Sequence, residues 1–282
     1  MIEESINRRN WPEAVGLLCE GFPGSKSEFW QSGRDRWRQV HSDNPDKPFG
    51  YIGRDKEGVA QTVLLTLRSP VPTEDGLERV NFSSWYVRER YRLFAPNMLK
   101  RLCNDSNCVY TDFTPSKSVE KMLDRFGYQF LGLDHIVFPT PAIAFRKSLS
   151  VVGKAATLEA VKTDPDLSKL LKDHDQFGCL ILGIKTDDGI SPIVLRTMVR
   201  KRVLRSAEVI FAQDVANLVR ALPAIARILL LRGYSLLEAD LPEGQQIKLP
   251  HHNWGRSTRY AKGPWRENQI NFSYSELPVL KI

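Results

Sequence analysis

The sequence predicts an α/β fold of the α+β type, with two units that each hold a mixed, mostly antiparallel sheet flanked by helices. Three observations lead to this fold class. The chain has 282 residues, enough for two domains of ordinary size. Amphipathic helices with recognisable start signals alternate with short apolar strands. The order of these elements in the first half partly repeats in the second, although the halves share no obvious sequence identity.

The first half opens with two predicted helices. Asn10 and Ser25 each stand three residues before a glutamate, the capping-box pattern, and apolar residues then recur at helical spacing. A meander of three strands follows. The order then continues as helix, strand, helix and strand. The predicted strands cover 48–54, 59–69, 79–87, 108–113 and 131–138, and the later helices cover 98–103 and 116–126.

The second half begins after two prolines at 139 and 141. Another meander is predicted over 177–185, 192–205 and 207–213, followed by a helix over 214–232 and a strand over 235–240. Pro223 either kinks that helix or starts a new one. A last strand is predicted over 269–280. We therefore expect domains at residues 1–140 and 141–282.

Composition is that of an ordinary globular protein. Apolar residues make up 42% and charged residues 26%, which excludes disordered, collagenous and coiled-coil classes. The net charge is +7, from 40 Lys and Arg against 33 Asp and Glu. Residues 1–140 hold 19 of each sign, whereas residues 141–282 hold 21 basic and 14 acidic residues. The whole excess of positive charge therefore belongs to the second half.

Targeting and metal-binding signals are weak. The first residues lack a basic stretch followed by an apolar one, and no apolar run approaches the ~18 residues of a membrane span. We expect a cytoplasmic protein without a membrane span. The four cysteines are too scattered for a disulfide framework or a zinc site, and His251 and His252 are adjacent and point apart on a strand. We therefore expect no metal.

Common nucleotide-binding and hydrolase motifs do not occur in the chain, including the P-loop, the dinucleotide fingerprint, the zinc-protease motif and the nucleophile elbow. The stretch 81–102 is more informative. A predicted strand runs into an arginine-rich loop and then into a helix. Backbone N–H groups and the positive end of a helix dipole converge at such a turn, which favours binding of a phosphate.

This junction resembles the GNAT superfamily of acyl-CoA-dependent N-acyltransferases. In that family an apolar residue at the strand end pairs with pantetheine, and an R-x-x-G-x-G loop wraps the pyrophosphate. Val87 matches the apolar position and Arg92 the arginine, while the loop is filled by Leu93, Phe94, Ala95, Pro96 and Asn97. The resemblance covers roughly residues 5–138, and residues 177–280 resemble a second, more divergent unit. It implies acetyl-CoA or another acyl-CoA as co-substrate and direct transfer of the acyl group to an amine.

The sequence departs from the family pattern in two places. Ala95 and Asn97 stand where the family has glycines, which let the backbone approach the pyrophosphate. Leu123 stands where many members have a tyrosine that protonates the leaving thiolate. Two functions therefore stay open: an N-acyltransferase, or a catalytically silent GNAT-like protein that serves binding or assembly.

Three residues are candidates for catalysis. Ser84 and Tyr86 share a face of the strand that would lie near a thioester. Asp112 ends the neighbouring strand and could deprotonate an amine directly or through water. Each also has a purely structural interpretation, as a strand hydroxyl with satisfied hydrogen bonds or as a turn residue. We expect His135 to be a core histidine.

The second half offers candidates for binding the acceptor. Arg196, Arg200 and Arg202 fall on one face if 193–204 is a regular strand, and this stripe could contact a small-molecule or polar acidic acceptor. A solvated sheet face is the usual explanation of such a stripe. Basic and aromatic residues also interleave over 256–266, but their spacing matches no nucleic-acid-binding module, so we do not expect nucleic acid as a partner.

Overall fold

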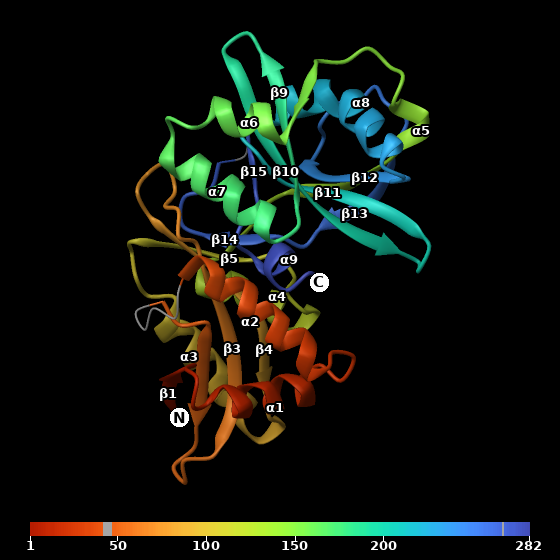
Figure 1. Cartoon of the computed structure of the whole chain (residues 1–282). Coiled ribbons are helices and arrows are strands. Elements are labelled where there is room, and N and C mark those ends of the chain that lie inside the picture. The colour runs from red at the N-terminus through yellow and green to blue at the C-terminus, as the bar shows by residue number, and fades with distance from the viewer. Residues whose placement is uncertain (42–46, 267) are drawn as a thin grey trace. The chain divides into compact units, whose positions relative to one another are not determined.

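The computed structural model describes residues 1–41, 47–266 and 268–282. Two mixed sheets flanked by helices confirm the predicted fold class (Figure 1). Unit 1 comprises Met1–Phe130, Arg259–Trp265 and Tyr274–Ile282; unit 2 comprises Leu131–Thr258 and Arg266–Ser273. The sequence predicts a boundary at residue 140 and assigns the whole tail to the second half, whereas the division falls at residue 130 and two tail segments belong to unit 1.

Unit 1 has a seven-stranded sheet in the order β1-β2-β3-β4-β5-β14-β6. Neighbouring strands are antiparallel except β4 and β5, which are parallel. The strands are β1 (Ile2–Ser5), β2 (Gly50–Arg54), β3 (Ala60–Arg68), β4 (Glu78–Val87), β5 (Cys108–Asp112), β6 (Gln129–Phe130) and β14 (Tyr260–Lys262). The helices are α1 (Trp11–Gly21), α2 (Ser27–His41), α3 (Ala95–Leu102), α4 (Lys117–Leu123) and α9 (Glu276–Val279), with the 3-10 turns η1 (Glu89–Phe94) and η2 (Asp124–Phe126).

Helices α1 and α2 cover one face of this sheet, across β3 and β4 (Figure 1). The amphipathic spacing of α1 buries Trp11 and Leu18 on that face. The predicted capping box at Asn10 does not form. The Asn10 side chain instead accepts a hydrogen bond from the Asn7 N–H at 2.7 Å and donates to Glu4 at 2.9 Å. It therefore fastens the turn before α1 to β1, a strand that the sequence analysis missed.

A second apolar layer lies against α3 and α4. Leu64 of β3 and Phe82 of β4 pack there with Leu99 and Leu123, and each is at most 3% exposed. Because successive strand residues point to opposite faces, β3 and β4 contribute to both layers of unit 1. This explains why every residue of β3 before Arg68 is buried.

Unit 2 has an eight-stranded sheet, ordered β13-β7-β12-β11-β10-β9-β8, with β15 paired to β11. Its strands are β7 (Leu133–Pro139), β8 (Val151–Gly153), β9 (Leu180–Thr186), β10 (Gly189–Arg200), β11 (Leu204–Ala212), β12 (Leu236–Pro242), β13 (His252–Ser257) and β15 (Ile270–Asn271). Its helices are α5 (Thr140–Ile143), α6 (Lys154–Ala160), α7 (Pro165–Gln176) and α8 (Val215–Leu231).

Two strand predictions in this region are wrong. The segment 131–138 forms β7, but it pairs with β12 and β13 in the second sheet rather than with the first. The strand expected over 269–280 is limited to the two residues of β15, and α9 follows it. Ser275 explains the break, because its hydroxyl accepts a hydrogen bond from the Leu277 N–H and so caps α9.

Helix α8 is one continuous helix that contains Pro223. Asp214 caps it by accepting a hydrogen bond from the Asn217 N–H at 2.9 Å. Proline disturbs the helical hydrogen bonds around it. Here the Ala224 N–H donates to Ser148 Oγ at 3.2 Å, and the Arg220 carbonyl accepts from the Leu149 N–H at 3.1 Å. Ser148 and Leu149 thus supply hydrogen-bond partners for backbone groups of α8 on either side of Pro223.

No helix in the described part of the chain is long and apolar enough to cross a membrane.

Candidate active site

Strands β4 and β5 of unit 1 pair over the first four residues of each, which is most of β5 but less than half of β4. Their parallel pairing extends from Glu78 and Cys108 to Asn81 and Thr111. The pairing ends at Asn81, whose Nδ2 donates a hydrogen bond to Thr111 Oγ1 at 3.1 Å. From Phe82 onward, β4 has no strand partner on that side among the described residues. The two strands therefore part, and one edge of β4 is left open.

A β-bulge lies on the open part of β4. The register with β3 shifts between Val63 and Leu65, so that Ser84 and Trp85 together oppose Leu64. Ser84 has a φ of 51°, in the left-handed region that residues other than glycine rarely adopt. Such local strain is often found at functional sites. The bulge also changes which side chains face each side of the strand.

A cavity of about 280 Å³ opens where β4 and β5 part. Leu64 and the β4 residues 82–85 line it, together with Asp112 at the end of β5 and residues from the α1–α2 connection, α3 and α4. Most of the lining side chains are apolar or aromatic, with several hydroxyls among them. Among the described lining residues, Asp112 has the one acidic or basic side chain. This composition is typical of a small-molecule site.

The Asp112 carboxyl is 9% exposed and has few groups that would stabilise its charge. Burial raises the pKa of Asp112 well above its usual range, and the negative charge of Glu276 raises it further. A hydrogen bond from the Thr114 N–H at 3.3 Å and the charge of Arg259 oppose this shift. A carboxyl group with a raised pKa in a cavity is suited to take up and release a proton.

Two tryptophans line the same cavity. Trp30 of α2 is 2% exposed, and Trp85 lies on the bulge of β4. The indole Nε1 atoms of both are buried, and neither has a hydrogen-bond partner among the described residues. An indole N–H can only donate, so the protein leaves both donors unsatisfied, and a ligand oxygen would reach them only after a side-chain movement. No local sequence pattern marks either residue as a site residue.

The predicted catalytic residues separate at the bulge. Ser84 and Asp112 both line the cavity. The Ser84 hydroxyl lies 3.1 Å from that of Ser83. Tyr86 is not a lining residue, and its hydroxyl donates to Glu20 of α1 at 2.8 Å. Of these two residues only Ser84 lines the cavity, because the bulge interrupts the regular alternation of side chains along β4.

The expected phosphate-binding stretch follows β4 directly. Val87 is the last residue of β4 and pairs with Thr62 of β3. Arg92 lies in η1, which continues into α3 at Ala95 without an intervening open loop. The Ala95 N–H donates to the Arg92 carbonyl, so one amide at the helix start is already bonded. Leu93, Phe94, Pro96 and Asn97 complete the stretch, and Leu93 is 89% exposed.

In unit 2, the predicted acceptor-binding arginines lie in different surroundings. Arg196 bonds to Glu208 of β11 at 2.7 Å, and Arg200 bonds to Glu238 of β12 at 2.6 Å. Arg202 lies beyond the end of β10, in the exposed turn before β11, with a φ of 66°. The regular strand expected over 193–204 ends at Arg200, so Arg202 does not share a strand face with the other two.

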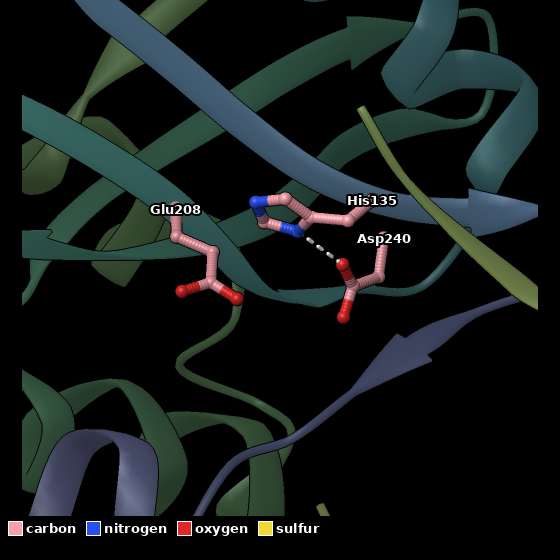
Figure 2. Close-up of side chains that lie close together, drawn as sticks. All are labelled: His135, Glu208 and Asp240. Carbon is pink, nitrogen blue, oxygen red and sulfur yellow. Dashed lines mark hydrogen bonds and ion pairs between the residues drawn. The ribbon is translucent and has the colours of Figure 1, made fainter. Parts of the chain in front are cut away.

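A network of buried charges extends from these arginines to His135. The Nδ1 atom of His135 is 2.6 Å from Asp240 (Figure 2). Its Nε2 atom is 2.9 Å from Glu238. Burial lowers the pKa of His135, but hydrogen bonds to Asp240 and Glu238 outweigh it and raise the pKa to about 9. Burial raises the pKa of Glu238, yet hydrogen bonds from His135, Arg200 and Ser206 bring it down to about 2. His135 and Glu238 are therefore both charged near neutral pH, and the network pairs three basic side chains with three acidic ones.

His135, Glu208 and Asp240 each offer one ligand atom within 4.8 Å of the others, a spacing that could hold a metal ion (Figure 2). However, all three already have protein partners. Glu208 bonds to Arg196, and Asp240 accepts from His135 and from Ser257 Oγ at 2.7 Å. The positive charges in the network also oppose a cation. These contacts fit a structural ion network better than a metal site.

Comparisons with known proteins concern the fold. No protein-family model and no curated protein sequence matches this chain. Among solved structures, it is similar to a conserved Enterococcus faecalis protein described as a probable N-acyltransferase, with 9% identity, a TM-score of 0.56, and coverage of 92% of this chain and 72% of that one. It is also similar to Eis1 from Mycobacterium abscessus, with 12% identity, a TM-score of 0.53 and coverage of 93% and 73%.

A GCN5-related N-acetyltransferase from Kribbella flavida gives a similar result, with 12% identity, a TM-score of 0.54 and coverage of 92% and 70% of the two chains. These likenesses extend over nearly the whole chain. They show that the chain has the fold of GNAT-type N-acyltransferases, as the sequence resemblance implies. At such low identity they show the fold alone, and function must be argued from the site.

Proposed function

We propose that unit 1 transfers an acyl group from an acyl-CoA to the amine of a small-molecule acceptor. The observation that carries this proposal is the position of Asp112, a buried carboxyl group with a raised pKa in the cavity where β4 and β5 part. The fold is compatible with such chemistry but does not by itself establish it.

The open edge of β4 supports the binding part of the proposal. Pantetheine contains two amide groups in an extended chain, so it can add to an unpaired strand edge in the way that a peptide does. The edge of β4 is available from Phe82 to Val87. At its end, Arg92 and the first turn of α3, with Leu93 to Asn97, would contact the phosphates.

The proposed reaction is a direct transfer without a covalent enzyme intermediate. Asp112, in its ionised form, removes a proton from the acceptor ammonium, and the neutral amine attacks the thioester carbon. The new C–N bond forms, the nitrogen of the tetrahedral intermediate gives its remaining excess proton to solvent water, and the C–S bond then breaks. The proton held by Asp112 is available to the CoA thiolate, directly or through water. Leu123 offers no hydroxyl for this step.

The carbonyl oxygen of the thioester gains negative charge during the attack, so donors near the bulge would stabilise the transition state. The proposed donors are backbone amides around Ser84, whose left-handed conformation reorients the chain, and the Trp85 indole N–H. A buried donor without a protein partner can bond an incoming oxygen without first breaking another hydrogen bond.

The rival function is a catalytically silent GNAT-like protein that binds acyl-CoA or takes part in an assembly. It is favoured by Ala95 and Asn97 at the expected glycine positions and by Leu123 at the expected tyrosine position. The two functions share the binding site and differ in turnover.

As to the acceptor, Arg202 remains available for an acidic group, whereas Arg196 and Arg200 would first have to leave their ion pairs.

The test uses the purified full chain. Calorimetric titration with CoA and acetyl-CoA measures binding, and release of the CoA thiol over a panel of amines measures turnover. Arg92→Ala should weaken CoA binding by roughly tenfold, the usual effect of losing a hydrogen bond to a charged group. The exposed Arg125→Ala serves as the matched control. Binding without turnover would support the silent function, and absence of binding would exclude both.

A further inference from the structure

One wall of the unit 1 cavity is part of the apolar core. Phe82, Leu99 and Leu123 line the cavity, and each is at most 3% exposed. Val119 lies one helical turn before Leu123 on α4 and lines the cavity as well. These four side chains form a continuous apolar surface, which we call the α3–α4 wall. A ligand group that touches this wall must itself be apolar to bind favourably.

The cavity also lacks the means to hold a charged group. Its lining includes no arginine, lysine or histidine side chain among the described residues. Its one acidic side chain, Asp112, is buried in surroundings that favour the neutral form. A carboxylate or phosphate would lose its hydration there without gaining a cation, which is costly.

The position of the cavity indicates which part of a ligand enters it. The cavity opens at the point where β4 leaves β5, and it includes the bulge residues Ser84 and Trp85. A pantetheine arm on the open edge of β4 would bring its thioester to this bulge. The group attached to the thioester then lies next to the α3–α4 wall. A volume of about 280 Å³ is close to the lower limit of ligand pockets and far exceeds that of a methyl group.

We propose that the cavity of unit 1 binds the acyl chain of the co-substrate, and that the transferred acyl group is longer than acetyl. This inference rests on the proposed function and specifies its donor. The bonds made and broken are those of the transfer described above, since the chain beyond the carbonyl takes no part in the reaction. The chain contributes affinity through burial of its methylene groups against the α3–α4 wall.

Calorimetric titration of the full chain with CoA, acetyl-CoA, butanoyl-CoA, hexanoyl-CoA and octanoyl-CoA tests the inference. The affinity should rise by up to about fourfold for each added methylene until the cavity is full. Binding of CoA with no increase from acetyl-CoA to hexanoyl-CoA would overturn the inference, leave the proposed function standing, and point to the acceptor as the occupant. If neither CoA nor any acyl-CoA binds, the inference and the proposed function both fail.

A variant with a narrower cavity tests where the acyl chain binds. Val119 is only partly buried, so Val119→Phe adds volume at the wall with little strain elsewhere. The preferred chain should shorten by about two methylenes, while the affinity for CoA itself stays unchanged. Lys121→Phe adds the same ring at an exposed position of α4 and should leave the chain-length series unaltered. An unaltered series in Val119→Phe would contradict this location for the acyl chain.

Discussion

The two units hold their buried carboxyl groups in opposite electrostatic surroundings. Asp112 in unit 1 lies in a largely apolar cavity, and burial together with the charge of Glu276 raises its pKa well above the usual range. Glu238 in unit 2 accepts hydrogen bonds from His135, Arg200 and Ser206, which lower its pKa to about 2. Both groups stand at strand positions of similar sheets, yet one favours the neutral form and the other the ionised form.

This difference distinguishes a site suited to proton transfer from one suited to structural support. A group can act as a base only if its proton affinity is matched to the working pH, and a raised pKa brings a carboxyl group closer to that condition. A carboxylate fixed in a balanced ion network instead holds its charge over a wide pH range. We therefore place the chemistry in unit 1, although unit 2 has the more conspicuous cluster of ionisable residues.

Asp112→Asn should produce the largest effect on catalysis. The amide keeps the shape of the carboxyl group but cannot accept a proton, so we expect kcat to fall by roughly 10²–10⁴-fold. The affinity for CoA itself should stay unchanged, because Asp112 is not a proposed contact of the CoA moiety. CoA-thiol release measures kcat, and the exposed Asp124→Asn is the control. A loss of less than fivefold would remove Asp112 from the mechanism.

His135→Gln should destabilise unit 2 strongly. The substitution removes a cation between Glu238 and Asp240, both fully buried, and breaking a buried ion pair costs about 3–5 kcal/mol. Hydrogen exchange of unit 2 amides measures the free energy of opening. His251→Gln, at an exposed position, provides the comparison. An equal, small effect of both substitutions would show that the network contributes little to folding.

The pH dependence of stability should differ between the units. The pKa of His135 is raised from 6.5 to about 9, so its contribution, at most about 3 kcal/mol, is full below pH 6.5 and is lost as the pH rises through 9. The lowered pKa of Glu238 makes its contribution full above pH 4.5, with loss as the pH falls through 2. For Asp112 the raised pKa means that stability decreases as the pH rises above 3.8.

Urea unfolding of the wild type, His135→Gln and Asp112→Asn between pH 4 and 9.5 isolates these contributions. The difference between the wild type and His135→Gln should shrink progressively as the pH rises from 6.5 to 9. Asp112→Asn should gain stability relative to the wild type as the pH rises from 4. Parallel curves for all three proteins would contradict the assigned directions.

Arg202→Glu should have the smallest effect. Arg202 is exposed in the turn after β10, so its reversal should change the free energy of unfolding by less than ~0.5 kcal/mol. Arg200→Glu places a second carboxylate beside buried Glu238 and should cost about 1–3 kcal/mol. Urea midpoints compare the two variants. If Arg202 contacts an acidic acceptor, its reversal raises KM for that amine while KM for a neutral amine stays the same.

Sequence patterns predicted the fold well where they were local. The strands around 50–54, 60–68 and 78–87 follow from alternation and turn residues, and the repeated element order indicated two similar units. The pairing of strands that lie far apart in the sequence was harder to predict. Nothing near residue 135 signals that β7 pairs with β12, more than 100 positions later. Likewise, β14 enters the first sheet from the tail, and only its partners in β5 and β6 define it as a strand.

The site was predictable only in part for the same reason. Asp112 and Ser84 were selected from their places at and near strand ends, which local patterns indicate. In a regular strand, Tyr86 and Ser84 would lie on the same face. No residue pattern in the sequence predicts the bulge that separates them. The pairing of Glu208 with Arg196 had a possible signal, since polar residues alternate along 206–208 and 238–240 within otherwise apolar strands. A buried polar stripe of this kind requires a complementary stripe next to it.

Hydrogen–deuterium exchange of the full chain with and without a saturating acyl-CoA tests most directly that the acyl-CoA site lies in unit 1. We predict slower exchange in β4 from Phe82 to Val87, in the first turn of α3 and in α4, with unchanged exchange in β10, β11 and β12 of unit 2. Protection confined to those strands of unit 2, with none in β4, would contradict the account.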